Sequence, residues 1–281
     1  MSAGTTGSSR FSEIRHFVEL DSTNRYLVDQ ARAGAEEGLV AVADHQTAGR
    51  GRLGRRWVAP PGANLLISVL LRPTLRVEEL HLSTVAMALA TRSACSTATA
   101  GAVVPVLKWP NDVMVGERKL AGILAETIPG GGVPGGGVPG GGVPGGGASE
   151  SRAVVVGLGL NVGWPPPDSE PTAVDLPDDL GPATSLWRES GTRMAPSDLL
   201  EALLNELARR LDDLDQPEGR RRMASEYREV CATLGRRVTV SLPEGPISGT
   251  VADITVEGHL LLDLGACTRT ITAGDVVHLR S

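Results

Sequence analysis

The amino-acid sequence predicts a mixed α/β protein of the α+β class, with a small β-barrel at its C-terminal end. Apolar segments of strand length and amphipathic segments of helical length follow one another over residues 14–231. Leucines within residues 199–211 recur on one helical face. After residue 231 the pattern changes to short strands separated by glycine and proline, which is typical of a small barrel. We therefore expect a larger domain at residues 13–230 and a smaller one at residues 231–281.

The first elements follow directly from this pattern. Residues 1–12 are mostly small and polar, so we expect a disordered tail. Residues 14–20 predict a strand. Residues 21–24 offer N-cap side chains for a short helix that should end near Gly34.

The later elements are predicted in the same way. The other strands of the larger domain are expected at residues 39–44, 64–71, 103–109, 112–115, 120–127 and 153–160. Its other helices are expected at residues 77–95, 199–211 and 219–231. The strands of the small domain are expected at residues 238–240, 247–251, 260–262 and 276–279.

Residues 129–147 repeat the unit Pro-Gly-Gly-Gly-Val with a period of five. The period is not three, so a collagen helix is excluded. With so few side chains to bury, the segment should be flexible, and its strand-like flanks place it at an expanded hairpin tip. We expect an inert expansion, with a binding role as the alternative.

Composition restricts the class of protein. The net charge of −6 argues against general nucleic-acid binding, and the aromatic content of 3% leaves the core to aliphatic side chains. Cys95, Cys231 and Cys267 lie far apart without metal-ligand spacing, so we expect buried, reduced thiols. The five histidines are scattered and suggest neither a zinc site nor a catalytic dyad. No secretory signal and no membrane span are expected, which makes the cytoplasm the expected location.

Two basic elements point to a site. The chain has 25 arginines but only two lysines, Lys108 and Lys119, and both fall in one short stretch. Lysine is a compact cation that suits one developing charge in a tight site. Residues 46–57 combine three glycines with four arginines, a composition that suits phosphate or carboxylate binding.

The basic segment also contains the pattern G-x-G-x-x-G, which we reject as a dinucleotide fingerprint. That fingerprint requires a helix directly after the glycines, whereas residues 57–62 contain two prolines and the next regular segment is a strand. A mobile, solvated basic loop is the remaining alternative.

Four motifs in order resemble those of the biotin–protein ligases. They are the basic loop, Lys-Trp-Pro-Asn-Asp at residues 108–112, Lys-Leu-Ala-Gly-Ile-Leu at residues 119–124, and Gly-Leu-Gly-Leu-Asn-Val at residues 157–162. The resemblance implies a catalytic domain related to class II aminoacyl-tRNA synthetases, followed by an SH3-like domain. Only about a dozen residues precede the catalytic region, so we expect no N-terminal DNA-binding domain, no repressor role and no nucleic-acid partner.

The resemblance also implies roles for individual residues. The residues implied to bind biotin are Ser22, Thr23, Asn24, Gln46, Arg50, Gly51, Arg52 and Lys119. The residues implied to bind ATP or the adenylate are Gly49, Arg50, Arg52, Arg55, Trp57, Asn111, Asp112 and Asn161. Lys119, Arg50 and Arg52 are expected to be catalytic, and Asp112 is the expected ligand of Mg²⁺.

Each of these residues also has an ordinary structural explanation. Ser22 is equally suited to a helix cap, and Gln46 to an exposed loop amide. Residues 111–112 follow a proline and form a common turn sequence. Asn161 could simply close a strand. Among the tryptophans, Trp109 is expected in the core, and Trp57 or Trp164 could stack on biotin or adenine.

The implied reaction has two steps. Biotin and ATP give biotinyl-5′-AMP and pyrophosphate, and a lysine of a biotin carboxyl carrier domain then displaces AMP. Neither step needs a protein nucleophile, which agrees with the lack of a Ser/His or Cys/His arrangement. Two alternatives stay open, a lipoate–protein ligase of the same fold and a nucleic-acid-binding regulator. We expect a monomer or a weak homodimer.

Overall fold

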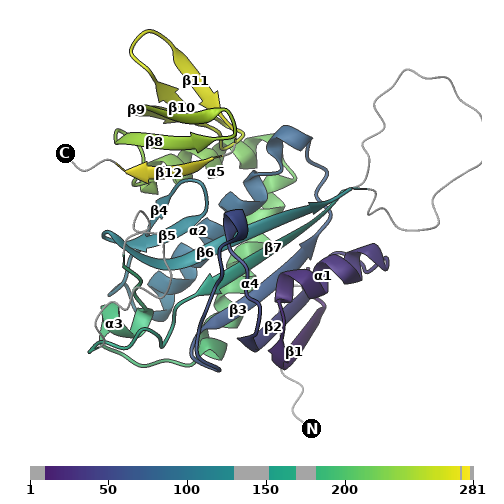
Figure 1. Ribbon diagram of the computed structural model, residues 1–281. Coiled ribbons are helices and arrows are strands. Elements are labelled where there is room, and N and C mark those ends of the chain that lie inside the picture. Colours follow the sequence, from purple (N-terminus) through teal and green to yellow (C-terminus); the bar gives the residue numbers. More distant parts are fainter. Residues whose placement is uncertain (1–9, 130–151, 169–181, 273, 279–281) are drawn as a thin grey trace, which may run out of the picture.

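The computed structural model describes residues 10–129, 152–168, 182–272 and 274–278 (Figure 1). Its larger sheet has seven strands in the order β1-β2-β3-β7-β6-β5-β4. Their bounds are Glu13–Leu20 (β1), Leu39–Gln46 (β2), Leu65–Leu71 (β3), Val106–Lys108 (β4), Asp112–Val115 (β5), Arg118–Ile128 (β6) and Ala153–Leu160 (β7). Only β1 and β2 are parallel, so the sheet is mixed, and the predicted α/β fold class is confirmed.

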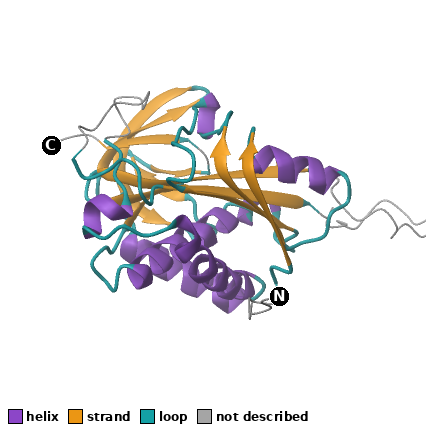
Figure 2. Cartoon of the chain, turned by 90° about the horizontal axis from the view of Figure 1, so that it is seen from below, coloured by secondary structure: helices purple, strands orange, loops and turns teal. Residues whose placement is uncertain are grey.

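Helices cover both faces of this sheet. Their bounds are Thr23–Arg32 (α1), Leu82–Ala98 (α2), Leu186–Ser190 (α3), Pro196–Leu214 (α4) and Pro217–Val230 (α5), with short 3₁₀ turns at Arg52–Gly54 (η1) and Val77–Glu79 (η2). Figure 2 shows α1 on one side of the sheet and most of the other helices together on the opposite side.

The apolar runs of the central strands follow from this two-sided burial. Along β2, Val40 packs in the large core with Leu89 of α2, whereas the adjacent Ala41 packs with Leu27 of α1. Successive side chains of a strand point to opposite faces. A strand covered on both faces must therefore be apolar at nearly every position, as β3 is.

The C-terminal part forms a second, five-stranded antiparallel sheet in the order β11-β10-β9-β8-β12. The bounds are Arg237–Leu242 (β8), Gly245–Ile254 (β9), Leu260–Asp263 (β10), Thr268–Ile271 (β11) and Asp275–His278 (β12). This sheet lies next to α5 and β4 in Figure 1. The predicted small β-structure is thus confirmed, although β11 had not been predicted.

Other boundaries differ from the predicted ones. The helix expected at residues 77–95 is divided into η2 and α2, because the Glu79 side chain accepts from the Arg76 N–H and closes the first turn by itself. The strand expected at residues 103–109 is reduced to β4. The helix α3 had no counterpart among the predicted elements, since its five residues are too few to show a period.

The predicted hairpin around the repeat is confirmed by its two strands. β6 and β7 pair antiparallel out to Ile128 and Ala153. Residues 1–9 of the expected tail and most of the repeat lie outside the described residues. The last part of that tail is ordered, because Phe11 is buried in the large core and Arg10 pairs with Glu37. No helix in the described ranges is long and apolar enough to cross a membrane.

The cysteine prediction is correct for two of the three thiols. Cys95 and Cys231 are buried and free, but Cys267 is exposed at the turn between β10 and β11. The prediction of burial was wrong for Cys267 because a turn cannot be told from a strand by one apolar residue.

Candidate active site

One cleft brings together most of the candidate residues. It lies over β6 and β7, between the N-terminus of α1, the basic loop and the turn that joins β4 to β5. Its lining includes Ser22, Thr23, Asn24, Gln46, Arg50, Gly51, Arg52, Arg55, Trp57, Asn111, Asp112 and Lys119. Gly49 lies in the adjoining groove on the other side of the loop.

The N-terminus of α1 forms one wall of the cleft. Ser22 caps the helix by accepting from the Arg25 N–H at 3.4 Å, so its predicted structural role is confirmed. The Gln46 Oε1 accepts from the Thr23 N–H at 2.8 Å and from the Thr23 hydroxyl at 3.1 Å. Gln46 therefore lies in the cleft as a fixed acceptor and is not a free loop amide.

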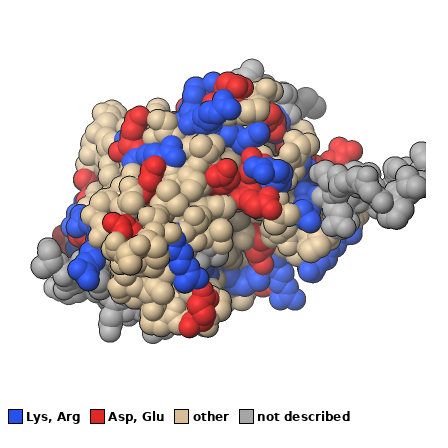
Figure 3. Space-filling view, turned by 90° about the horizontal axis from the view of Figure 1, so that it is seen from above, with Lys and Arg blue, Asp and Glu red and all other residues tan. Residues whose placement is uncertain are grey.

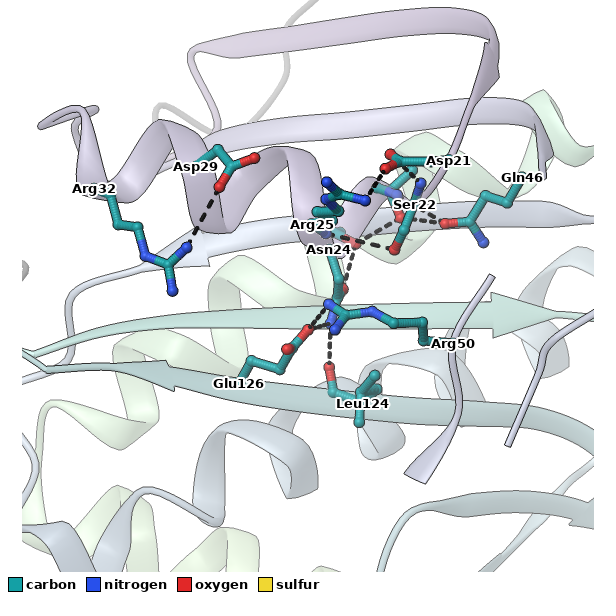
Figure 4. A network of polar contacts seen from close by, with 12 residues as sticks. Asp21, Ser22, Asn24, Arg25, Asp29, Arg32, Gln46, Arg50, Leu124 and Glu126 are labelled. Atoms are coloured by element: carbon teal, nitrogen blue, oxygen red, sulfur yellow. Dashed lines mark hydrogen bonds and ion pairs between the residues drawn. The ribbon is translucent and has the colours of Figure 1, made fainter. Parts of the chain in front are cut away.

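Asn24 extends this network to β6 (Figure 4). Its Nδ2 donates to the Leu124 carbonyl at 3.1 Å and to Glu126 at 2.9 Å, and its Oδ1 accepts from the Ser68 hydroxyl at 2.6 Å. Ser68 was not among the candidate residues. A serine within the otherwise apolar run of β3 was a signal for it, because a buried hydroxyl requires a hydrogen-bond partner.

Three glycines make room for these side chains. A Cβ atom at Gly157 would lie 1.9 Å from the Asn24 Oδ1, and one at Gly159 would lie 2.4 Å from the Trp57 ring. Gly122, which pairs with Gly159 across β6 and β7, also lies beneath Trp57. The Trp57 ring can therefore pack closely against β6 and β7 because glycines occupy these positions.

The basic loop is held at both sides of the cleft. The Arg50 guanidinium pairs with Glu126 of β6 at 2.6 Å. Arg52 donates to the Asn111 Oδ1 at 3.3 Å and to the Gly274 carbonyl of the C-terminal part at 3.1 Å. The loop is followed by the strand β3 and no helix, so the exclusion of a dinucleotide fingerprint is confirmed.

Lys119 lies inside the cleft, next to Asp112. The two side chains are nearly buried, and the ammonium is 2.6 Å from the Asp112 Oδ1. The same ammonium lies 5.9 Å from the centre of the Trp57 ring. Asp112 begins β5 directly after the predicted turn. The cleft therefore combines the Lys119 ammonium with several arginine side chains, which suits two anionic reactants.

Of the remaining candidates, Asn161 and Trp164 lie outside the lining of the cleft, whereas the buried Trp109 is part of it. Asn161 is buried at the end of β7, where its Oδ1 accepts from Asn64 at 2.9 Å, and it does not line the cleft. Trp164 donates its backbone N–H to Asn64 and is likewise outside the lining. Trp109 is only 1% exposed, so the expected core position is confirmed.

The cleft also contains residues that had not been predicted as site residues. Lys108 is buried and lines the cleft from β4, and Val276 reaches it from β12. The scarcity of lysine was a signal for Lys108. No local pattern pointed to Val276, because only the packing of the two sheets brings it there.

The fold and the cleft define the class of biotin and lipoate protein ligases. Residues 17–139 match the Biotin/lipoate A/B protein ligase family, and residues 233–279 match the Biotin protein ligase C terminal domain. The chain belongs to the biotin protein ligase family.

Individual relatives agree with this assignment. The chain is 37% identical over 278 residues to the biotin–[acetyl-CoA-carboxylase] ligase of Mycobacterium tuberculosis, covering 97% of this chain and 91% of the relative. It is 32% identical to the ligase of the same name from Paracoccus denitrificans, over 91% of this chain and 96% of the relative. It is also similar to a biotin protein ligase from Aquifex aeolicus in complex with biotin and ATP, with a TM-score of 0.73, 26% identity and coverage of 96% and 100% of the two chains.

Proposed function

We propose that this cleft activates biotin with ATP and transfers it to a lysine of a biotin carboxyl carrier domain. The protein is a ligase that forms a carbon–nitrogen bond, as the biotin–[acetyl-CoA-carboxylase] ligases related to it are. The observation that carries the proposal is the nearly buried Lys119 ammonium, which shares a cleft with Arg50 and Arg52.

Biotin binding is assigned to the wall formed by α1 and the end of β2. The proposed residues are Ser22, Thr23, Asn24, Gln46, Arg50, Gly51, Arg52 and Lys119. The fixed orientation of Thr23, Asn24 and Gln46 supports this assignment, because pre-organised amides and hydroxyls lose little freedom when a ligand binds.

The first step joins two anions, the carboxylate of biotin and the α-phosphate of ATP. The carboxylate oxygen attacks the α-phosphorus, the bond to the bridging oxygen breaks, and pyrophosphate leaves. Lys119 lowers the barrier by holding positive charge where the two anions meet, and Arg50 and Arg52 bind phosphate oxygens. The near burial of the Lys119–Asp112 pair supports this role, because charges interact more strongly away from water.

Nucleotide binding is assigned to the basic loop and to the residues beyond it. The proposed residues are Gly49, Arg50, Arg52, Arg55, Trp57, Asn111, Asp112 and Asn161. For Asn161, a contact with the adenine requires the cleft to extend toward the end of β7, since Asn64 holds its side chain there.

Magnesium is expected to accompany the triphosphate, with Asp112 as its protein ligand. Within the described ranges no three His, Cys, Asp or Glu side chains are grouped to hold a metal ion. A single carboxylate fits Mg²⁺ that is held mainly by phosphate oxygens and water. When bound, Mg²⁺ would offset the charge of the departing pyrophosphate.

In the second step the amine of the carrier lysine attacks the carbonyl of the mixed anhydride, and AMP leaves. The anhydride must be kept from water until the carrier arrives. The basic loop is suited to this, because Arg50 and Arg52 tie it to opposite sides of the cleft. We expect a monomer or a weak homodimer and no nucleic-acid partner.

The experiment is to incubate the protein with ATP, an apo carrier domain and either biotin or lipoate, and to weigh the carrier by mass spectrometry. We expect the mass increase of one biotinyl group and none with lipoate. An increase with lipoate alone would establish the alternative ligase. An unchanged carrier mass with both acids would refute the proposal.

A further inference from the structure

The C-terminal part contacts a chain segment that contributes three polar residues to the cleft. Residues 108–112 form the turn between β4 and β5, and Lys108, Asn111 and Asp112 all line the cleft. Next to this segment, the turn between α5 and β8 pairs with β4 through a bridge between Leu107 and Cys231. The Ala232 N–H donates to the Leu107 carbonyl at 2.8 Å.

Thr233 bonds this segment directly through its side chain. It is fully buried, and its hydroxyl oxygen accepts from the Trp109 backbone N–H at 3.0 Å. The same oxygen lies 3.2 Å from the His278 Nε2 on β12. A threonine hydroxyl can accept one bond while donating another, so a neutral His278 completes the arrangement.

The state of His278 fits this pattern. Burial, and then the positive charges of Lys108 and Arg236, lower the pKa of His278 to about 4. The imidazole is therefore neutral at pH 7, and its Nε2 is free to accept the Thr233 proton.

We propose that Thr233 is a positioning residue for the ligase reaction: its hydroxyl, held between Trp109 and His278, keeps residues 108–112 in place at the cleft. The inference rests on the proposed function. Asp112 holds the Lys119 ammonium at 2.6 Å, and the Asn111 Oδ1 accepts from Arg52 at 3.3 Å. A shift of this turn therefore displaces both proposed charge-bearing side chains.

The effect should be larger on catalysis than on biotin binding, because only Lys119 and Arg52 among the proposed biotin-binding residues depend on this turn. Thr23, Asn24 and Gln46 are fixed by β3 and β6 and have no contact with Thr233 among their hydrogen bonds. Displacement of reacting groups by about 1 Å can reduce a rate on the order of 100-fold.

The test compares Thr233→Val with Thr233→Ser. Valine has nearly the shape of threonine but leaves the Trp109 N–H without an acceptor, whereas serine keeps the hydroxyl. At saturating biotin and ATP, we expect pyrophosphate release by Thr233→Val to be slower by about 10- to 100-fold, and Thr233→Ser to stay within about threefold of the wild type. Biotin affinity, measured by calorimetry, should fall by a smaller factor than the rate in Thr233→Val, and should change by less than about twofold in Thr233→Ser.

Thr239→Val is the matched control. Its hydroxyl bonds Ser248 on the exposed side of the C-terminal sheet, 2.8 Å away, and the change should leave the rate unaltered. Where the valine variant does not fold, Thr233→Ala removes the same hydroxyl without adding a methyl group in its place.

Two results would overturn the inference. One is a Thr233→Val rate within about twofold of the wild type. The other is a rate loss that serine does not rescue and that accompanies an equal loss of biotin affinity. A wild-type protein that releases no pyrophosphate with biotin and ATP would instead overturn the proposed function, and this inference with it.

Discussion

Lys119 and Asp112 form a nearly buried ion pair, so removing either side chain leaves the charge of the other without its partner. Their side chains are only 11% and 8% exposed. Removing one member of a buried ion pair typically costs roughly 3–5 kcal/mol of stability, and less where water can enter. A test of Lys119 must therefore separate its catalytic charge from its structural one.

Lys119→Ala is expected to slow biotin-dependent pyrophosphate release by about 100- to 1,000-fold, because it removes the cation from between the two anions. In the double variant Lys119→Ala with Asp112→Asn, thermal stability should recover while the rate stays low. Near-normal release by the single variant would contradict the role of Lys119.

Gly157→Ala is expected to weaken biotin binding at least about 10-fold, because its Cβ would lie 1.9 Å from the Asn24 Oδ1 and would displace a proposed ligand contact. Calorimetry with biotin alone measures the affinity. The control is Asn24→Ala, in which the added Gly157→Ala should cost little more, since the clash is gone. Equal losses in both backgrounds would show that the two residues act separately.

At the scale of elements, the basic loop is the segment whose order should depend on the reactants. Leu53 is 72% exposed at a left-handed backbone position, whereas Arg50 and Arg52 anchor the loop at its two sides. Anions that bind these arginines should therefore tighten the loop over the cleft.

Trypsin provides the measurement, because it cleaves after the arginines of this loop. We expect rapid cleavage within residues 50–56 in the protein alone and strong protection by biotin with ATP. Arg193, in the connection between α3 and α4, is the internal control and should be cut at the same rate in both conditions. Equal loop cleavage in both conditions would refute ligand-dependent ordering.

The predicted elements were correct where the apolar residues follow one clear pattern, as in the continuous apolar run of β7 and along the leucine face of α4. They were wrong where a side chain ends an element locally, as Glu79 does for η2. The short α3 and β11 offered too few residues for a period to emerge.

On the scale of the whole molecule, charge is dispersed. Basic and acidic side chains are interspersed on the face shown in Figure 3, without a continuous basic surface there. The net charge of the chain is −6, so the arginines and lysines of the cleft form a local positive site on an acidic protein. The two sheets meet around Trp109, whose Nε1 donates to the Gly258 carbonyl at 3.0 Å.

His81 makes this contact between the two parts sensitive to acid. It packs against Gly258, and burial, followed by His259 and Arg52, lowers the pKa of His81 to about 4. The unfolded chain binds the proton first as the pH falls below 6.5. The stabilising contribution of neutral His81 is therefore complete above that pH and is lost as the pH falls toward 4.

Between pH 7 and pH 5, His81 should account for a loss of about 2 kcal/mol in the free energy of unfolding. Urea unfolding at both pH values measures this loss in the wild type and in His81→Phe, which should lose correspondingly less. His16→Gln, at an exposed position of β1, is the control and should behave as the wild type. The same loss in His81→Phe would assign the acid sensitivity to other groups.

The sequence by itself determined the chemistry of this protein and the order of its elements. Glycine, arginine and lysine at residues 46–57 and 108–119 point to an anion site, since residue type alone decides which charges a segment can bind. Only the tertiary structure decided which groups meet. Strand register and sheet packing decide three contacts: the ion pair of Lys119 with Asp112, the hydrogen bond of Ser68 to Asn24, and the hydrogen bond of Trp109 to Thr233. Such contacts join residues far apart in the chain, and no local pattern encodes them.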